Sequence, residues 1–184
     1  FSGLWLVILG WFGFSASRSQ KQMLTLQKVL GDLTVGSANS RRFRVLEEDN
    51  SLDKLSDLRL SGTNPDSLPE WVLICRAGRW VGYVNDEALM DLPVQYWKQH
   101  RLVDYTKPLS ELPSIGEKAM LWEAVLALEK SDEGRLLVFN LAGLPSGTLD
   151  RVDVGEAVLR HLGLRVSKNF LEVARKQNIY PLGL

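Results

Sequence analysis

Two stretches, WVLICRAGRWVGYV (71–84) and RLLVFNLAGLPSGTLDRV (135–152), decide the fold. Each opens with a continuous apolar run, which is typical of a strand covered on both faces of a sheet. In the first stretch AGR (77–79) turns the chain and WVGYV returns as a partner strand. In the second, LAGLPSG (141–147) makes the turn and TLDRV follows. The sequence therefore predicts the same β-hairpin twice.

Similar elements surround both hairpins. FRVL (43–46) predicts a strand, NSLDKLSDLRL (50–60) a capped helix and DEALMDL (86–92) a second helix. Around the second hairpin, SIGEKAMLWEAVLALEK (114–130) predicts a helix opened by a capping box of Ser114 and Glu117, and DVGEAVLRHLG (153–163) another helix. The expected fold is α/β (α+β), built from two β-α-β-β-α units.

The two halves superpose at an offset of 65 residues. Gly82 then falls on Gly147, Ile74 falls on Phe139, and the helix after Ser51 falls on the helix after Gly116. The order of elements carries this repeat, since few residues are identical. Two generic α/β units in one chain are the alternative explanation.

Composition excludes several classes of function. The 184 residues carry 22 Lys plus Arg and 22 Asp plus Glu, so the basic excess of a nucleic-acid surface is missing. The single cysteine, Cys75, lies in an apolar run and is expected in the core. His100 and His161 lie in separate segments, and no pair of residues has zinc-ligand spacing. We therefore expect no catalytic residue and no metal ligand in this chain.

The segment 1–16 carries no charge and is apolar over most of its length. A bilayer crossing needs about 20 apolar residues, so we interpret this segment as the end of a transmembrane helix. Arg18 and Lys21 follow it and indicate the cytoplasmic side. A signal peptide and a buried helix of a soluble domain are the alternatives. A connecting helix is expected within 17–34.

The repeated unit resembles a tandem CBS domain pair, in which two β-α-β-β-α units dock with pseudo-symmetry. The resemblance implies a first CBS unit at 35–93, a linker at 94–104, a second unit at 105–163 and a C-terminal tail at 164–184. It also implies regulation rather than chemistry, with adenine nucleotides bound in clefts between the units of many such pairs. Many pairs dimerise face to face, so a homodimer is an expected partner.

The ligand motif of that family runs Gly, two mostly apolar residues, Thr or Ser, two variable residues and Asp, and the Asp holds the ribose hydroxyls. GTLDRVD (147–153) keeps Gly147 and Asp153 but has Asp150 where Thr or Ser is usual. Asp150 adds a carboxylate that should repel phosphates. The corresponding positions of the first unit are Asn85 and Ala88. Asp153 would also be favoured simply as a helix cap.

The opening of the chain resembles the junction between the last membrane helix and the CBS pair of bacterial and chloroplast-type site-2 proteases. The resemblance rests on Gly10-Trp11 in an apolar helix, a basic-polar helix after it, and Leu30-Gly31. It implies a membrane-embedded zinc protease whose catalytic half precedes Phe1, with the CBS module on the cytoplasmic side and its own membrane domain as partner. A CBS module of a membrane transporter or channel is the alternative parent.

Overall fold

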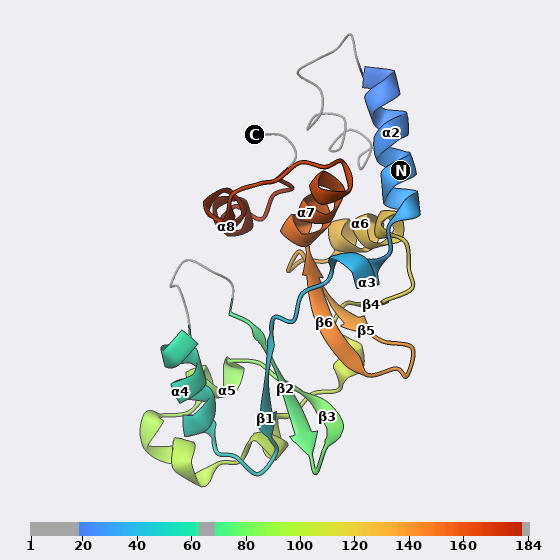
Figure 1. Cartoon of the computed structure of the whole chain (residues 1–184). Coiled ribbons are helices and arrows are strands. Elements are labelled where there is room, and N and C mark those ends of the chain that lie inside the picture. Colours follow the sequence, from blue (N-terminus) through green and yellow to red (C-terminus); the bar gives the residue numbers. More distant parts are fainter. Residues whose placement is uncertain (1–18, 63–68, 182–184) are drawn as a thin grey trace. The chain divides into compact units, whose positions relative to one another are not determined.

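The computed structural model describes residues 19–62 and 69–181, and Figure 1 follows the chain through them. The chain divides into two compact units. We call Arg42–Leu112 the central unit, and Phe1–Arg41 together with Pro113–Leu184 the terminal unit. Each unit is described by itself.

These units differ from the boundaries predicted from the order of elements. Residues 35–41, assigned above to the first CBS unit, belong to the terminal unit. The predicted linker at 94–104 belongs to the central unit, where it forms the 3-10 helices η1 (Val94–Gln99) and η2 (Leu102–Tyr105). Leu102 is fully buried among the apolar side chains of that unit, so this segment is part of its core.

The central unit has the predicted order strand, helix, strand, strand, helix. The parallel pairing of the first two strands places a helix between them, and the third strand pairs antiparallel with the second. The elements are β1 (Phe43–Glu47), α4 (Leu52–Gly62), β2 (Trp71–Arg76), β3 (Arg79–Val84) and α5 (Glu87–Asp91).

The core of the central unit forms around β2, whose first five residues are buried. Val72 and Ile74 contact Leu52 and Leu55 of α4 within one apolar cluster. Removal of each such side chain from water stabilises the unit by about 1.5–3 kcal/mol. Cys75 is buried as predicted, and its burial raises the pKa of its thiol, so the thiol stays protonated at neutral pH.

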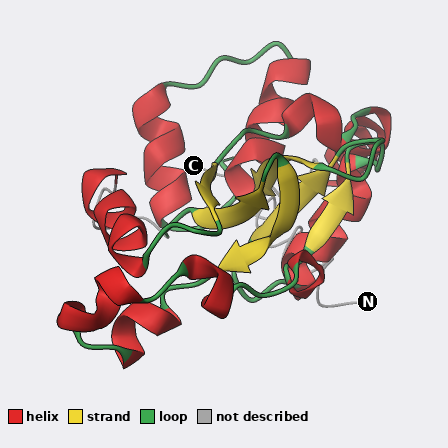
Figure 2. Cartoon of the chain, turned by 90° about the horizontal axis from the view of Figure 1, so that it is seen from below, coloured by secondary structure: helices red, strands yellow, loops and turns green. Residues whose placement is uncertain are grey.

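The terminal unit repeats this topology. Its strands also pair parallel and then antiparallel, and Figure 2 shows the strands in yellow and the helices in red. The elements are β4 (Ser114–Gly116), α6 (Leu121–Lys130), β5 (Arg135–Phe139), β6 (Pro145–Asp150) and α7 (Arg151–His161).

The predicted start of the helix at Ser114 is wrong. Ser114–Gly116 form β4, because the backbone there pairs with β5 and the N–H of Leu137 donates to the carbonyl of Pro113 at 2.8 Å. The helix α6 begins later, at Leu121, where the Glu123 carboxylate accepts the N–H of Met120 at 3.1 Å. The cap position is therefore Met120 and not Ser114, and the carboxylate that accepts its N–H is that of Glu123 and not of Glu117.

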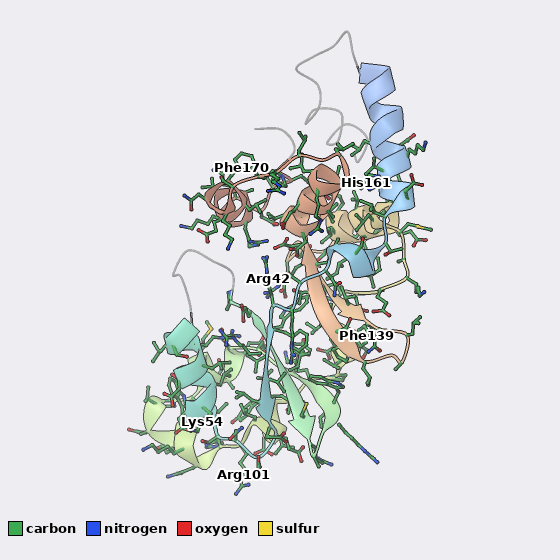
Figure 3. The ribbon with its side chains drawn as sticks, in the orientation of Figure 1. Arg42, Lys54, Arg101, Phe139, His161 and Phe170 are labelled. Carbon is green, nitrogen blue, oxygen red and sulfur yellow. The ribbon has the colours of Figure 1, made fainter. Side chains whose placement is uncertain are left out.

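The hairpins superpose with a small correction to the predicted offset. Ile74 pairs with Gly82 and Val138 pairs with Gly147. The offset is therefore 64 (138 − 74) in the first hairpin strand and 65 (147 − 82) in the second. Ile74 corresponds to Val138 and not to Phe139, which lies at the end of β5 (Figure 3). Both strands show a register shift directly after the paired residue, so the bulge is repeated too.

The first helices of the two units do not share that offset. Helix α4 begins at Leu52 and α6 at Leu121, which gives 69 residues (121 − 52). The superposition of the helix after Ser51 on a helix after Gly116 is therefore wrong. The loop that follows α4 is longer than the loop that follows α6, and this length difference changes the offset.

Among the described residues of the terminal unit there are three further helices: α2 (Ser19–Asp32), α3 (Val35–Ala38) and α8 (Lys168–Lys176). Helix α2 lies within the segment predicted as a connecting helix, and its Leu26, Val29 and Leu30 are buried in the core that α6 and α7 share. The predicted membrane segment 1–16 lies outside the described residues. No helix among the residues that the structure describes is long and apolar enough to span a bilayer.

Candidate functional site

The corner where β6 ends and α7 begins brings Gly147, Asp150 and Asp153 together. Asp150 caps the helix, because its Oδ1 accepts the N–H of Asp153 at 2.8 Å. The hydrogen bonding is reciprocal, because Oδ2 of Asp153 accepts the N–H of Asp150 at 3.0 Å. The two carboxylates thus satisfy backbone donors at the positive end of the helix dipole. Asp150 is therefore the helix cap, and Asp153, which the sequence suggested for that role, is its reciprocal partner at the third position of the helix.

A segment distant in sequence runs beside this corner. The N–H of Ser40 donates to the carbonyl of Thr148 at 3.0 Å, and the N–H of Thr148 donates to the carbonyl of Ser40 at 2.6 Å. Gly147 permits this approach, since a Cβ there would overlap the side-chain amide of Asn39 and lie 2.9 Å from the Ser40 oxygen. The Ser40 hydroxyl then lies 3.4 Å from both oxygens of Asp153.

An arginine from the C-terminal helix faces both carboxylates. Arg175 of α8 donates its Nε–H to Oδ2 of Asp150 at 3.1 Å, and its Nη2 lies 3.4 Å from Oδ1 of Asp153. Asp153 is only 3% exposed. Since a buried charge is costly unless it is paired and hydrogen-bonded, Arg175 and the Ser40 hydroxyl stabilise the ionised carboxylate.

Sequence reasoning missed Ser40 and Arg175. Ser40 lies 113 residues from Asp153, and no local pattern links the two. The amphipathic pattern of KNFLEVARKQ (168–177) predicts a helix, which α8 confirms, but it does not say where that helix packs. His161 ends α7 at the solvent-exposed surface (Figure 3).

The arrangement is suited to accepting hydrogen bonds rather than to catalysis. A carboxylate such as Asp153 accepts from hydroxyl groups, as its contact with Ser40 illustrates. The second carboxylate, Asp150, adds negative charge, and the Arg175 guanidinium offsets it. Within the described residues, no group of three or more His, Cys, Asp or Glu side chains could hold a metal ion.

The equivalent corner of the central unit has a similar backbone and different side chains. Lys107 pairs with Tyr83 through two backbone bonds of 2.9 and 2.8 Å, and Gly82 leaves room for it. Ala88 is buried where the terminal unit has Asp153, and the Asn85 side chain accepts the N–H of Glu87 at 3.2 Å. A carboxylate equivalent to Asp153 is therefore replaced by a small apolar side chain that packs in the core.

No protein-family model matches the chain, and no curated protein matches it in sequence. Solved structures do match it. The CBS domain of a bacterial CNNM/CorC-family Mg²⁺ transporter in complex with ATP is 18% identical, covers 76% of this chain and 96% of its own, and has a TM-score of 0.56. The fold is that of a tandem CBS domain pair.

Two other solved CBS pairs have similar statistics. The CBS pair of the putative Mg²⁺ transporter SO5017 from Shewanella oneidensis is 16% identical, with 78% and 80% of the two chains covered and a TM-score of 0.53. CBSX2 in complex with AMP is 21% identical, with 70% and 98% covered and a TM-score of 0.51. Identities this low establish the CBS-pair fold alone. The α/β class and the tandem CBS architecture expected from the sequence are confirmed.

Proposed function

We propose that this CBS pair is a regulatory module that binds an adenine nucleotide at the β6–α7 corner. The observation that carries the proposal is the buried Asp153 carboxylate at the start of α7, next to the strand in which Gly147 permits close backbone approach. Two of the CBS pairs with this fold were solved with ATP and with AMP, which supports the choice of ligand class.

The residues of the corner fit the sugar of a nucleotide better than its phosphates. Asp153 would accept the ribose hydroxyls, and Gly147 would keep the neighbouring backbone close. Asp150 adds a negative charge that disfavours a phosphate beside it, so the phosphates would lie away from this carboxylate. Binding regulates the module only if the ligand prefers one arrangement of the protein over another.

We further propose that the module serves a membrane protein of the transporter or channel class, on its cytoplasmic side. Two of the CBS pairs with this fold are described as parts of Mg²⁺ transporters, actual or putative, which supports the alternative parent more than the site-2 protease. The protease, with its zinc, rests on the sequence resemblance around Gly10-Trp11, and none of the comparisons supports it. A homodimer and contact with a membrane domain remain part of this proposal.

Nucleotide binding at the corner is tested by calorimetric titration of the full chain with ATP and AMP. Titration with GTP tests whether the site selects adenine over guanine. Asp153→Asn should weaken binding of ATP or AMP about tenfold, because a neutral amide is a poorer acceptor for two hydroxyls. Asp53→Asn is the matched control, since Asp53 lies in the first turn of α4 and is hydrogen-bonded to Ser51. Absence of binding, or equal binding by both variants, would overturn the proposal.

The class of membrane protein that carries the module is tested by reading the residues encoded before Phe1 in the intact gene. Several long apolar segments without HExxH would support a transporter or channel. An HExxH on an apolar helix, with a later Asp-Gly motif on another, would restore the zinc protease, because these residues bind the metal and activate water.

A further inference from the structure

Helix α8 lies directly on the corner just described. Its first turn is capped by Ser167, whose hydroxyl oxygen accepts the N–H of Phe170 at 3.3 Å. Leu171 and Ala174 are buried against Val152, the second residue of α7. Figure 1 shows α8 beside α7 within the terminal unit. The helix therefore covers the beginning of α7, where the two carboxylates lie.

The contact of α8 with the unit is partly charged and partly apolar, with Val166 and Ile179 packed beside its buried residues, and the chain after the helix is held by the buried Tyr180. Only Leu171 and Ala174 among the residues of the helix are buried, while Val173 is 48% exposed. The segment that leads into α8 is also poorly buried, with Leu164 at 55% exposure. Elements with few buried apolar contacts open at lower free energy than the core. The contacts of Arg175 with Asp150 and Asp153 therefore add to a limited apolar contact in keeping α8 in place.

Arg175 uses the acceptor positions that a ribose would need. A carboxylate has about four lone-pair sites. Those of Asp153 already face the N–H of Asp150, the hydroxyl of Ser40 and the guanidinium of Arg175. Two sugar hydroxyls cannot be added without displacing a donor. Arg175 is the donor whose departure also uncovers the corner, because it comes from α8, whereas the Asp150 N–H is fixed by the helix cap and the Ser40 hydroxyl can only rotate in place.

We propose that α8 is a displaceable cover of the β6–α7 corner, pinned by Arg175, and that Arg175 and the ligand compete for Asp153. The identity of the ligand rests on the proposed function; the pinning of α8 does not. Because only the open form binds, the apparent affinity is the intrinsic affinity multiplied by the open fraction. Any event that detaches the C-terminal helix would then raise the affinity of the module for its ligand.

The test compares Arg175→Gln with wild type by two measurements on the full chain. Lys168→Gln is the matched control, since it removes one positive charge from the exposed surface of the same helix. Hydrogen–deuterium exchange should become faster across 168–176 in Arg175→Gln, while α6 and β5 keep their protection and show that the unit is folded. Titration with ATP and AMP should give a Kd lower by about tenfold in Arg175→Gln and unchanged in Lys168→Gln.

The two measurements test separately whether Arg175 pins α8 and whether the corner binds a nucleotide. Unchanged exchange across 168–176 in Arg175→Gln would overturn the pinning. Faster exchange with an equal or weaker Kd would overturn the competition and leave nucleotide binding intact. Faster exchange with no nucleotide bound by any variant would support the pinned cover and overturn the proposed ligand. Addition of ATP or AMP to wild type should itself speed exchange in α8 if the competition is correct.

Discussion

The corner after Gly82 and the corner after Gly147 have a common backbone and different chemistry. In each, the residue after the glycine forms an antiparallel bridge with a segment from elsewhere in its unit, Lys107 in one case and Ser40 in the other. The central corner then places the buried, apolar Ala88 where the terminal corner places a carboxylate. A glycine is therefore needed by the fold in both units, because a neighbouring segment approaches it closely in each, whereas a carboxylate at the start of the following helix is present only in the terminal unit.

A second difference concerns the ion pair that links the two helices of each unit. In the central unit Arg59 of α4 contacts Asp86, just before α5, at 2.9 Å. In the terminal unit Glu129 of α6 contacts Arg151, the first residue of α7, at 3.2 Å. The same connection is made with the signs exchanged. Such pairs therefore fasten the helices in both units without fixing which side carries which charge.

The largest effect is expected from adding a methyl group to the two glycines. In Gly82→Ala the new Cβ would overlap the backbone carbonyl of Lys107, which cannot move without breaking its bridge to Tyr83. Overpacking of this kind costs about 3 kcal/mol of unfolding free energy. In Gly147→Ala the closest atom belongs to the side chain of Asn39, which can rotate away, and the nearest backbone atom, the Ser40 carbonyl oxygen, lies at 2.9 Å, so a smaller loss of about 1 kcal/mol is expected.

Urea unfolding of both variants measures this difference. Asn39→Ala combined with Gly147→Ala is the control, because it removes the side chain that the new methyl meets and should recover part of the lost stability. Equal losses in the two glycine variants would contradict the idea that the closer backbone contact at Gly82 makes its corner the less tolerant of the two.

The next effect is the loss of the carboxylate that distinguishes the terminal corner. Asp153→Ala removes the acceptor of the Asp150 N–H and leaves the half-buried Ser40 hydroxyl and part of Arg175 without this partner. We expect a loss of about 2 kcal/mol in unfolding free energy. Asp153→Asn keeps one acceptor oxygen and should lose about half as much. A change below about 0.5 kcal/mol in Asp153→Ala would mean that this corner tolerates an alanine as the central corner does.

Much of the fold follows from local patterns in the sequence. The apolar runs of β2 and β5, with a turn after each, predict both hairpins. The stretch from Gly147 to Asp153 indicates roughly where α7 starts, but the structure places the start at Arg151 rather than at the predicted Asp153. The strand β4 could not be predicted in this way. Its three residues do not form an apolar run, and its first residue, Ser114, is of a type that is common at helix caps. Its identity depends on backbone pairing with β5, which is a tertiary contact.

The partners of the candidate site escaped prediction for a related reason. Asp150 and Asp153 follow from the spacing GTLDRVD, which is local. Ser40 and Arg175 come from other parts of the chain, one before the corner and one after it. The bridge to Thr148 places Ser40 there, and the packing of α8 places Arg175 there. A single sequence shows that 35–41 follows α2, but it does not show which hairpin that segment joins. Only the folded chain assigns it to the terminal unit.

A smaller effect is expected from Tyr180, which joins the ion pair of the terminal unit. Its O–H donates to Oε1 of Glu129 at 3.2 Å. Burial, and then the negative charge of Glu129, raises the pKa of Tyr180 above its ordinary value of 10.0. The folded state therefore holds this proton more tightly than the unfolded state. Its contribution is complete below about pH 10 and is lost as the pH rises further.

Tyr180→Phe should lose about 1 kcal/mol in unfolding free energy at neutral pH, because Glu129 loses a hydrogen bond. The variant should also lose less stability than wild type between neutral pH and about pH 11. Urea unfolding at the two pH values measures both effects. An identical alkaline loss in the two proteins would show that the tyrosine is ionised as easily in the folded chain as in the unfolded chain.

The smallest effect concerns Lys107, which takes the place of Ser40 at the central corner. Its Nζ lies 3.1 Å from Oε2 of Glu87. This hydrogen bond is the main reason why the pKa of Glu87 lies below its ordinary value of 4.5. The pair therefore stabilises the fold at neutral pH, and this contribution is lost as the pH falls below that value. Both side chains are exposed, so the effect is small and salt should screen it.

Glu87→Gln should make unfolding slightly less sensitive to acid in dilute buffer and should have no effect at about 1 M salt, where charges are screened within about 3 Å. Asp153, fixed by a helix cap and buried, should by contrast keep its effect in salt, because screening acts weakly on buried pairs. Acid unfolding of Glu87→Gln and urea unfolding of Asp153→Asn at neutral pH, each at low and high salt, therefore separate the two corners by exposure rather than by charge. An equal response to salt would mean that the buried carboxylate is no better shielded from solvent than the exposed one.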